Sequence, residues 1–341
     1  MSIHPLPHRS PPSSVTPTPA LGSLAHFGFA WFVPVMGWAG LALAWFQSSP
    51  AEAGIPWVAQ VASWIAAIVL ALVLFTHLVR AVRHPQALWA DLRHPVRMAF
   101  TASLAIALVL MATLGTLWGL ADTVWVQAMW WVGSLLEFSI TAWVMSRCLR
   151  PADSGGLTWP AVTPLLIIPI VGNVLVPLAG LQWPVQGWIS AQFGVGLFLW
   201  PLVLGLLLVR WIQAGPLPAR MTPTLFILVA PPSAIGLALL QWSAAPVLAW
   251  ACWGVALMSL LWALSQVRLI AGLTFGLPHW GMSFPLAAFS ALCLRLSRLP
   301  EGQWLLQPAW LALGLTTGII LWLSWQSVLG LMNGRLLQPE G

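Results

Sequence analysis

Apolar residues along the chain fall into ten runs, each about as long as a membrane-spanning helix. Roughly 20 consecutive apolar residues cross the hydrocarbon core of a bilayer as an α-helix. The breaks between the runs carry turn or charge signals, such as Ser48-Ser49-Pro50, His84-Pro85 and Gly215-Pro216. The pattern therefore predicts ten transmembrane helices, with approximate bounds 24–46, 57–79, 97–119, 123–146, 159–180, 186–211, 221–242, 246–268, 279–297 and 305–331.

The ninth run combines a proline with an aromatic residue. It begins at His279 and carries no charge before Arg295, and within it Phe284 directly precedes Pro285. Proline inside a helix removes a backbone hydrogen bond and clashes with the preceding turn, at a cost of about 3 kcal/mol in water. A kinked spanning helix with an aromatic residue at the bend is a candidate pore element. Ordinary packing of Phe284 beside the kink is the alternative interpretation.

Composition places the chain among polytopic all-α membrane proteins. Sixty per cent of its residues are hydrophobic and 6% are charged, whereas a soluble domain has about 25% charged residues. The net charge of +6 lies on the loops of an apolar protein, so it indicates membrane orientation and not nucleic-acid binding. We find no Ser-His-Asp constellation, HExxH motif or phosphate-binding glycine loop, and the three cysteines lack metal-ligand spacing. The sequence therefore predicts no enzyme activity, no metal site and no cofactor.

Arginine placement predicts the orientation in the membrane. All thirteen basic residues are arginine, and with ten helices only Arg295 and Arg298 fall on the side opposite the two termini. The positive-inside rule then places both termini in the cytoplasm of a bacterial-type inner (plasma) membrane. The eleven arginines on the cytoplasmic side are Arg9, Arg80, Arg83, Arg93, Arg97, Arg147, Arg150, Arg210, Arg220, Arg268 and Arg335.

Three regions follow from this topology. Residues 1–22 are rich in Pro, Ser and Thr and have little apolar content, which is typical of a disordered tail. The first apolar run is too long for the core of a cleavable signal peptide, so we expect it to be retained. The prediction is a cytoplasmic N-terminal tail at 1–22, a ten-helix transmembrane domain at 23–334 and a cytoplasmic C-terminal tail at 335–341.

Prolines separate the odd-numbered helices from the even-numbered ones. Only Pro201 lies clearly inside an even-numbered helix. Kinked helices are tolerated in membranes where neighbouring helices or water satisfy the freed backbone groups. The odd helices are therefore candidates for the interior of the bundle, although helix 3 lacks an internal proline. The prolines inside odd-numbered helices are Pro34, Pro164, Pro169, Pro177, Pro231, Pro232 and Pro285.

Six fragments on the predicted helices carry a resemblance to a known family. They are Phe27-Gly28-Phe29 with Gly37-Trp38-Ala39-Gly40, Asp91-Leu92-Arg93-His94-Pro95-Val96-Arg97 with Phe100, Pro169-Ile170-Val171-Gly172-Asn173, Pro223-Thr224-Leu225-Phe226 with Ala230-Pro231-Pro232, Trp280-Gly281-Met282-Ser283-Phe284-Pro285, and Gly334-Arg335-Leu336. With these fragments the chain resembles the tellurite-resistance/dicarboxylate transporter (TDT) family, which includes the TehA-like and slow anion channels. The resemblance covers nearly the whole chain from about residue 24.

The resemblance implies a fold and a set of pore residues. The family fold is ten transmembrane helices arranged as five helical hairpins around a pseudo-five-fold central pore, with odd helices inside and even helices outside. Its members are typically homotrimers, and a Phe on helix 9 plugs a largely uncharged pore. Phe284 holds that position in this chain. The residues that become candidates for lining the pore or forming its kinks are Phe29, Pro34, Phe100, Pro169, Asn173, Phe226, Pro231, Ser283 and Pro285.

Two functions remain open at this point. The first is passive permeation of small inorganic or organic anions, gated by rotation of the Phe284 ring. The second is proton-coupled transport of dicarboxylates or tellurite. Glu137 is the one acid deep in a predicted span, where a carboxylate costs about 2.5–3.5 kcal/mol. It is either a proton-coupling residue or, as we favour, a helix-packing residue. Flux against a gradient distinguishes the two functions.

Overall fold

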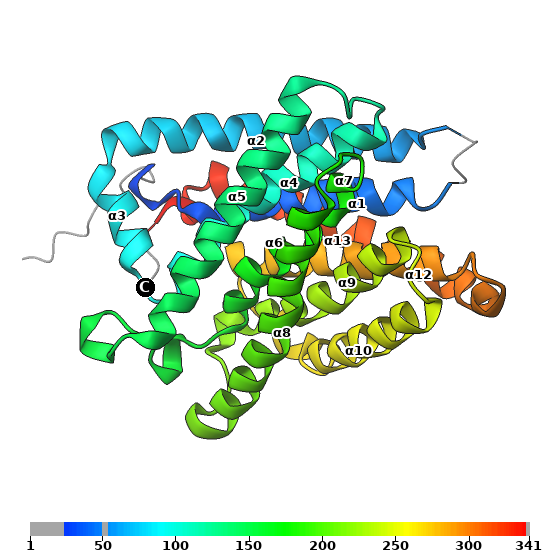
Figure 1. Ribbon diagram of the computed structural model, residues 1–341. Helices are drawn as coiled ribbons and strands as arrows, with labels where there is room; N and C mark the ends of the chain where they lie inside the picture. Colours follow the sequence, from blue (N-terminus) through cyan, green and yellow to red (C-terminus); the bar gives the residue numbers. More distant parts are fainter. Residues whose placement is uncertain (1–23, 50–53, 339–341) are drawn as a thin grey trace, which may run out of the picture.

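The computed structural model describes residues 24–49 and 54–338, and every regular element within them is a helix (Figure 1). The prediction of an all-α protein is confirmed. The α-helices are α1 Val33–Phe46, α2 Trp57–Arg83, α3 Pro85–Arg93, α4 Thr101–Leu117, α5 Val124–Ser146, α6 Ile168–Leu175, α7 Pro177–Gly180, α8 Gln186–Ala214, α9 Ala230–Gln241, α10 Pro246–Leu264, α11 Val267–Ala271, α12 Ser283–Leu296 and α13 Leu306–Met332. The 3₁₀ segments are η1 Leu24–His26, η2 Phe29–Phe32, η4 Arg97–Phe100, η5 Arg147–Leu149, η6 Ala152–Ser154, η7 Trp159–Ala161, η8 Pro164–Ile167, η9 Ala219–Val229, η10 Leu277–Met282, η11 Pro300–Leu305 and η12 Arg335–Leu337.

Eight helical stretches of the described residues are long and apolar enough to cross a membrane. They coincide with eight of the ten predicted runs, all except the fifth and the ninth. The fifth run contains a shorter apolar helical stretch, Pro164–Gly180, and the ninth consists of η10 followed by the 14-residue α12. The eight are Phe29–Phe46, Trp57–Arg83, Arg97–Leu117, Val124–Leu149, Gln186–Ala214, Ala219–Gln241, Pro246–Leu264 and Pro300–Met332.

The helices differ in how much of their surface is buried. The most apolar windows of Phe29–Phe46, Arg97–Leu117 and Ala219–Gln241 are 72–78% buried, whereas those of the other five spans are 22–39% buried. Nearly all residues of α6 and α12 are also buried. The exposed faces of α2, α5, α8, α10 and α13 carry many Leu, Val and Trp side chains, the composition expected of helices that contact lipid.

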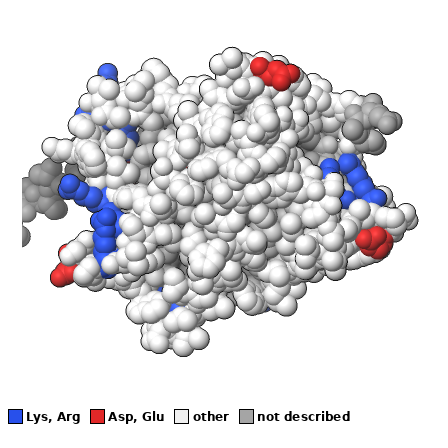
Figure 2. Space-filling model, viewed as in Figure 1, with Lys and Arg blue, Asp and Glu red and all other residues white. Residues whose placement is uncertain are grey.

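The five buried helices close a ring. α1 packs against α4, α4 against α6, α6 against α9, α9 against α12, and α12 against α1. Outside the ring, α2 packs on α1, α5 on α4, α8 on α6, α10 on α9 and α13 on α12. Figure 2 shows the charged residues on one face of the molecule. Blue atoms gather at two opposite ends of the view, and the surface between them is almost uncharged apart from one red patch at its upper edge.

Each ring helix begins as a 3₁₀ segment and continues as an α-helix: η2 leads into α1, η4 into α4, η8 into α6, η9 into α9 and η10 into α12. Proline lies in the first α-helical turn of four of them, at Pro34, Pro169, Pro231 and Pro285. The sequence predicted kinks within continuous helices. The structure instead places these prolines where a 3₁₀ turn passes into an α-helix, a position at which the missing N–H group is tolerated.

Hydroxyl groups on α13 bind tryptophans of two ring helices. The indole Nε1 of Trp38 donates to Ser324 at 3.1 Å, and that of Trp45 donates to Thr317 at 3.2 Å. Trp280, which precedes α12, donates to Ser327 at 2.8 Å. A buried indole N–H needs an acceptor, so these bonds fix α13 against the ring.

A buried ion pair ties together the segments at one end of the ring. Arg80 of α2 is 1% exposed, and its Nη2 donates to Oδ2 of Asp91 at 2.7 Å. Its Nε and Nη2 also donate to the carbonyl of Ala25, at 3.2 and 2.9 Å. Arg97 of η4 contacts the other Asp91 oxygen at 3.2 Å. The carboxylate of Asp91 therefore links α2, α3, η4 and the segment that leads into α1.

The predicted N-terminal tail, with Arg9, lies outside the described residues. At the other end, residues 335–337 form η12, and Leu336 packs against Gly330 of α13. The final residues, 339–341, are again outside the described part of the chain.

Candidate functional site

Three cavities lie in series among the ring helices. The first, here called the Arg97 pocket, has a volume of about 50 Å³. The second, the Trp280 cavity, has about 30 Å³, and the third, the Arg295 cavity, about 190 Å³. Phe100 and Leu277 line both the first and the second, and Phe284 lines both the second and the third. Each pair of neighbouring cavities thus adjoins the same side chain or side chains.

The lining residues show that the ring helices run in the same direction. The N-terminal ends of all five line the Trp280 cavity, and the C-terminal halves of the same stretches line the Arg295 cavity. A helix carries roughly half a positive charge at its N-terminus and half a negative charge at its C-terminus. The helix termini therefore favour an anion in the Trp280 cavity. At the opposite end, Arg295 adds a positive charge where the backbone contributes negative potential.

No acidic residue of the described chain lines the Trp280 cavity or the Arg295 cavity. The Arg97 pocket contains Asp91, but Arg80 and Arg97 both bind that carboxylate. The charged side chains along the series are therefore predominantly cationic. Such a lining attracts small anions and repels cations.

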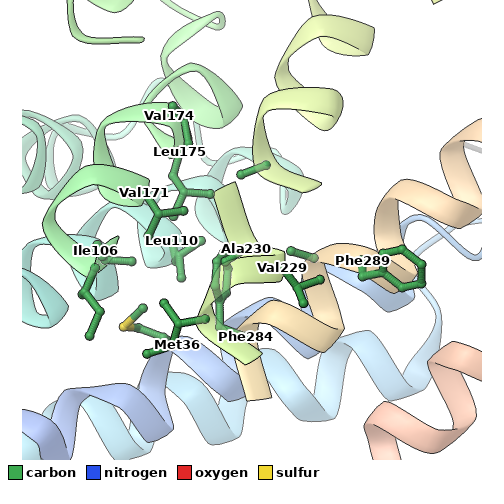
Figure 3. Close-up of a cluster of buried hydrophobic side chains, with 14 of the residues drawn as sticks. Met36, Ile106, Leu110, Val171, Val174, Leu175, Val229, Ala230, Phe284 and Phe289 are labelled. Carbon is green, nitrogen blue, oxygen red and sulfur yellow. The ribbon is translucent and has the colours of Figure 1, made fainter. Parts of the chain in front are cut away.

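Phe284 is the second residue of α12 and is 4% exposed. Figure 3 shows it beside Ala230 and Val229, with Met36 of α1 and Val171 of α6 on other sides. The turn that carries Phe284 has an internal hydrogen bond, in which the Ser283 hydroxyl donates to the carbonyl of Trp280 at 2.7 Å. The ring thus lies among side chains of several ring helices at the junction of two cavities.

Glycines of α1 allow this turn to approach closely. A methyl group on Gly40 would lie 2.9 Å from a ring carbon of Phe284 and 3.2 Å from Cβ of Ala287. A methyl group on Gly37 would lie 2.6 Å from Oγ and 2.8 Å from Cβ of Ser283. Small residues at helix contacts let backbones pack closely in membranes. The position of the Phe284 ring therefore depends on the α1–α12 contact.

Replacing Gly37 with alanine is expected to destabilise the protein by about 1–3 kcal/mol, the usual cost of an overpacked contact. The added methyl group has to separate α1 from the backbone-bonded Ser283. Thermal unfolding in detergent measures the effect. Gly318→Ala on α13 is the control, because its methyl group would meet no atom within 4 Å. Equal midpoint temperatures for the two variants would contradict this account of the contact.

The structure brings some of the other predicted pore residues to the cavities. Phe100 and Pro285 line the Trp280 cavity, and Phe29 lines the Arg97 pocket. Asn173 instead faces α5, where its Nδ2 donates to Thr141 Oγ1 at 2.7 Å. The predicted candidates that line none of the three cavities are Pro34, Pro169, Asn173, Phe226, Pro231 and Ser283.

Glu137 lies between α5 and α6, outside the series of cavities. It is fully buried, and neither carboxyl oxygen has a hydrogen-bond partner among the described residues. The carboxyl group packs directly on Gly172 of α6, where a side chain would collide with it. The residue is therefore well placed to hold the two helices in contact, and it does not touch any of the three cavities.

Sequence reasoning missed several residues of the Arg295 cavity. Arg295 was used only to predict the orientation in the membrane, and the sequence did not single out Gln47, Gln182 or Gln241. All four lie at or just beyond the C-terminal ends of helical stretches. Polar side chains recurring at the same end of the odd-numbered runs were the available signal.

Comparison with known proteins bears on this geometry. Residues 26–332 match the voltage-dependent anion channel family. The chain belongs to this family. The resemblance predicted from six fragments is therefore confirmed, and the match includes all five ring helices.

Two relatives of the chain are uncharacterized transporters of Methanocaldococcus jannaschii. One is 24% identical over 291 residues, which cover 79% of this chain and 84% of the relative. The other is 26% identical over 231 residues, which cover 59% of this chain and 64% of the relative. Membership of the family indicates a membrane protein that transports anions and implies that the chain is not an enzyme.

Proposed function

We propose that the chain is a passive channel for small anions, of the TehA/slow anion channel type, with Phe284 as its gate. The observation that carries the proposal is the series of cavities along the ring, in which Phe284 alone lines both the Trp280 and Arg295 cavities of the described structure. The helix N-termini at the Trp280 cavity and the guanidinium of Arg295 at the Arg295 cavity favour anions.

We further propose the family architecture for the whole chain. The fifth and ninth runs complete ten spans, and the ring helices with their outer partners form five hairpins around a pseudo-five-fold axis. Both termini then lie in the cytoplasm of a bacterial-type inner membrane, with eleven arginines on that side and Arg295 and Arg298 opposite. By resemblance to the family we expect a homotrimer embedded in lipid.

In this mechanism an anion enters past Arg97, sheds part of its hydration in the apolar Trp280 cavity and meets the Phe284 ring. An apolar constriction excludes ions by excluding water. Rotation of the ring away from the junction joins the two cavities and admits the anion. Selection among anions then follows the ease of dehydration, because the Trp280 cavity offers no charged side chain of the described chain.

Flux measurements in liposomes test the proposal with chloride, nitrate, malate and tellurite. We expect downhill flux of at least one of these anions, with a rate that follows its electrochemical gradient and no accumulation beyond equilibrium. Liposomes without protein are the control. Flux of none of the four anions, or flux of cations at equal rates, would overturn the proposal.

Buried Glu137 favours one alternative, a proton-coupled carrier of dicarboxylates or tellurite. An ionisable residue inside a membrane that has no hydrogen-bond partner among the described residues is a candidate for proton binding. The carrier predicts that an imposed pH gradient drives malate or tellurite beyond equilibrium, and that Glu137→Gln abolishes this accumulation while passive flux persists. Passive flux alone, unchanged in Glu137→Gln, supports the channel.

A further inference from the structure

We propose that the Arg295 cavity is a binding site for small monocarboxylates, with the guanidinium of Arg295 as the group that receives the carboxylate. The inference rests on the proposed function, because it assigns a ligand class to one end of the same anion pathway. It follows from the free charge of Arg295 and from the amide and apolar side chains that line the same cavity.

Arg295 has no structural task within the described chain. It lies in the last turn of α12, is partly exposed to the cavity, and takes part in no hydrogen bond or ion pair that the described residues form. Its neighbour Arg298 behaves differently, because its Nη2 donates to the carbonyls of Gln47 and Ser49. Arg298 holds the loop after α1, whereas Arg295 presents an uncommitted cation to the cavity.

Three amide side chains line the same cavity as this cation. Gln47, Gln182 and Gln241 come from three different ring stretches and line the same cavity. The Gln241 Nε2 donates to the carbonyl of Leu178 at 3.0 Å, which fixes its amide in place and leaves its second N–H free. One guanidinium and three amide side chains, all of them N–H donors, therefore line a single cavity that has no acidic residue of the described chain in its lining.

The shape of these donors and of the wall selects the class of anion. A guanidinium donates two parallel hydrogen bonds to the two oxygens of a carboxylate, whereas a halide has only one atom to accept them and does not match the fork. The single positive charge of Arg295 matches the single negative charge of a monocarboxylate. The remaining wall is apolar and suits a short hydrocarbon chain: Leu43, Leu117, Leu175, Leu178, Leu237, Ala234, Ala288 and Ala291. The volume of about 190 Å³ leaves room for several heavy atoms.

Propionate and chloride are the probes, and the variants are Arg295→Gln, Arg295→Lys and the control Arg268→Gln, at an exposed arginine that lines none of the three cavities. We expect Arg295→Gln to raise the propionate concentration that half-saturates liposome flux by at least about tenfold, because one charge-assisted pair is lost. The half-saturating chloride concentration should change much less. Arg295→Lys keeps the charge but lacks the planar fork, so its half-saturating propionate concentration should lie between those of the wild type and Arg295→Gln. Arg268→Gln should resemble the wild type, because it removes a positive charge that does not line the cavity.

A binding measurement separates this inference from the proposed function. Propionate should raise the thermal unfolding midpoint of the wild-type protein in detergent, and should not raise that of Arg295→Gln. The carboxylate site would be overturned if Arg295→Gln changed the half-saturating concentrations of propionate and chloride equally. It would also be overturned if propionate still raised the unfolding midpoint of Arg295→Gln. Absence of all anion flux while propionate still stabilises the wild type through Arg295 would refute the channel and leave the site standing.

Discussion

Replacing Phe284 with alanine is expected to raise anion flux in liposomes by at least about tenfold, equivalent to a barrier lowered by ~1.4 kcal/mol. The ring lies at the junction of the Trp280 and Arg295 cavities. Its removal joins them into one hydrated path, and an apolar constriction that has become wet conducts ions. Single-channel or flux recording with chloride and nitrate measures the change.

Phe289→Ala is the matched control for this experiment. Phe289 lies on the same helix, is 6% exposed and lines none of the three cavities, and Figure 3 shows its ring away from Phe284. Both variants remove a buried phenyl ring and carry a comparable loss of packing. Raised flux in Phe284→Ala alone supports the gate. Unchanged flux in a well-folded Phe284→Ala protein would show that the ring is ordinary packing beside the proline.

The hydrophobic pattern predicted most of the fold because transmembrane helices follow from local composition. The second run, for example, is apolar over the length that forms α2, and no tertiary contact is needed to recognise it. The α12 region is harder, since part of its predicted span is a 3₁₀ segment and the α-helix itself has 14 residues. Four of the five ring helices have a proline in their first α-helical turn and α4 has none, and the placement of these prolines at 3₁₀-to-α junctions depends on packing around the ring.

The candidate site was less predictable, since cavities depend on how five helices meet. Phe284 stood out in the sequence because an aromatic residue precedes a proline. Asn173 was a candidate for the same pore because it is a polar residue in a predicted span, yet it donates to Thr141 at the α5–α6 contact. Arg295 resembled any topology-determining arginine until the structure placed it in a cavity with three glutamines. Which face of a helix meets the pore is a tertiary property that the spacing of residues does not show.

The second large effect is expected at the buried carboxylate of Asp91. Its two oxygens bind Arg80 and Arg97, and the side chains of Arg80 and Asp91 are 2% and 6% exposed. Removing one partner of a buried ion pair leaves an uncompensated charge and costs about 3–5 kcal/mol. Arg80 also holds the carbonyl of Ala25, so we expect the entry into α1 to loosen together with the pair.

Asp91→Ala should therefore lower the thermal unfolding midpoint in detergent far more than Asp122→Asn, a control at an exposed acidic residue. In Asp91→Ala the buried guanidinium of Arg80 has lost its carboxylate partner, so removing the Arg80 charge as well should restore stability. The double variant Arg80→Met, Asp91→Leu is expected to recover most of the loss, because apolar residues of similar volume replace a buried pair at little cost. If the double variant is as unstable as Asp91→Ala, the loss comes from the bond to Ala25 and the packing of α3, and the ion pair itself contributes little. That comparison separates the electrostatic role of Asp91 from its role as a link between segments.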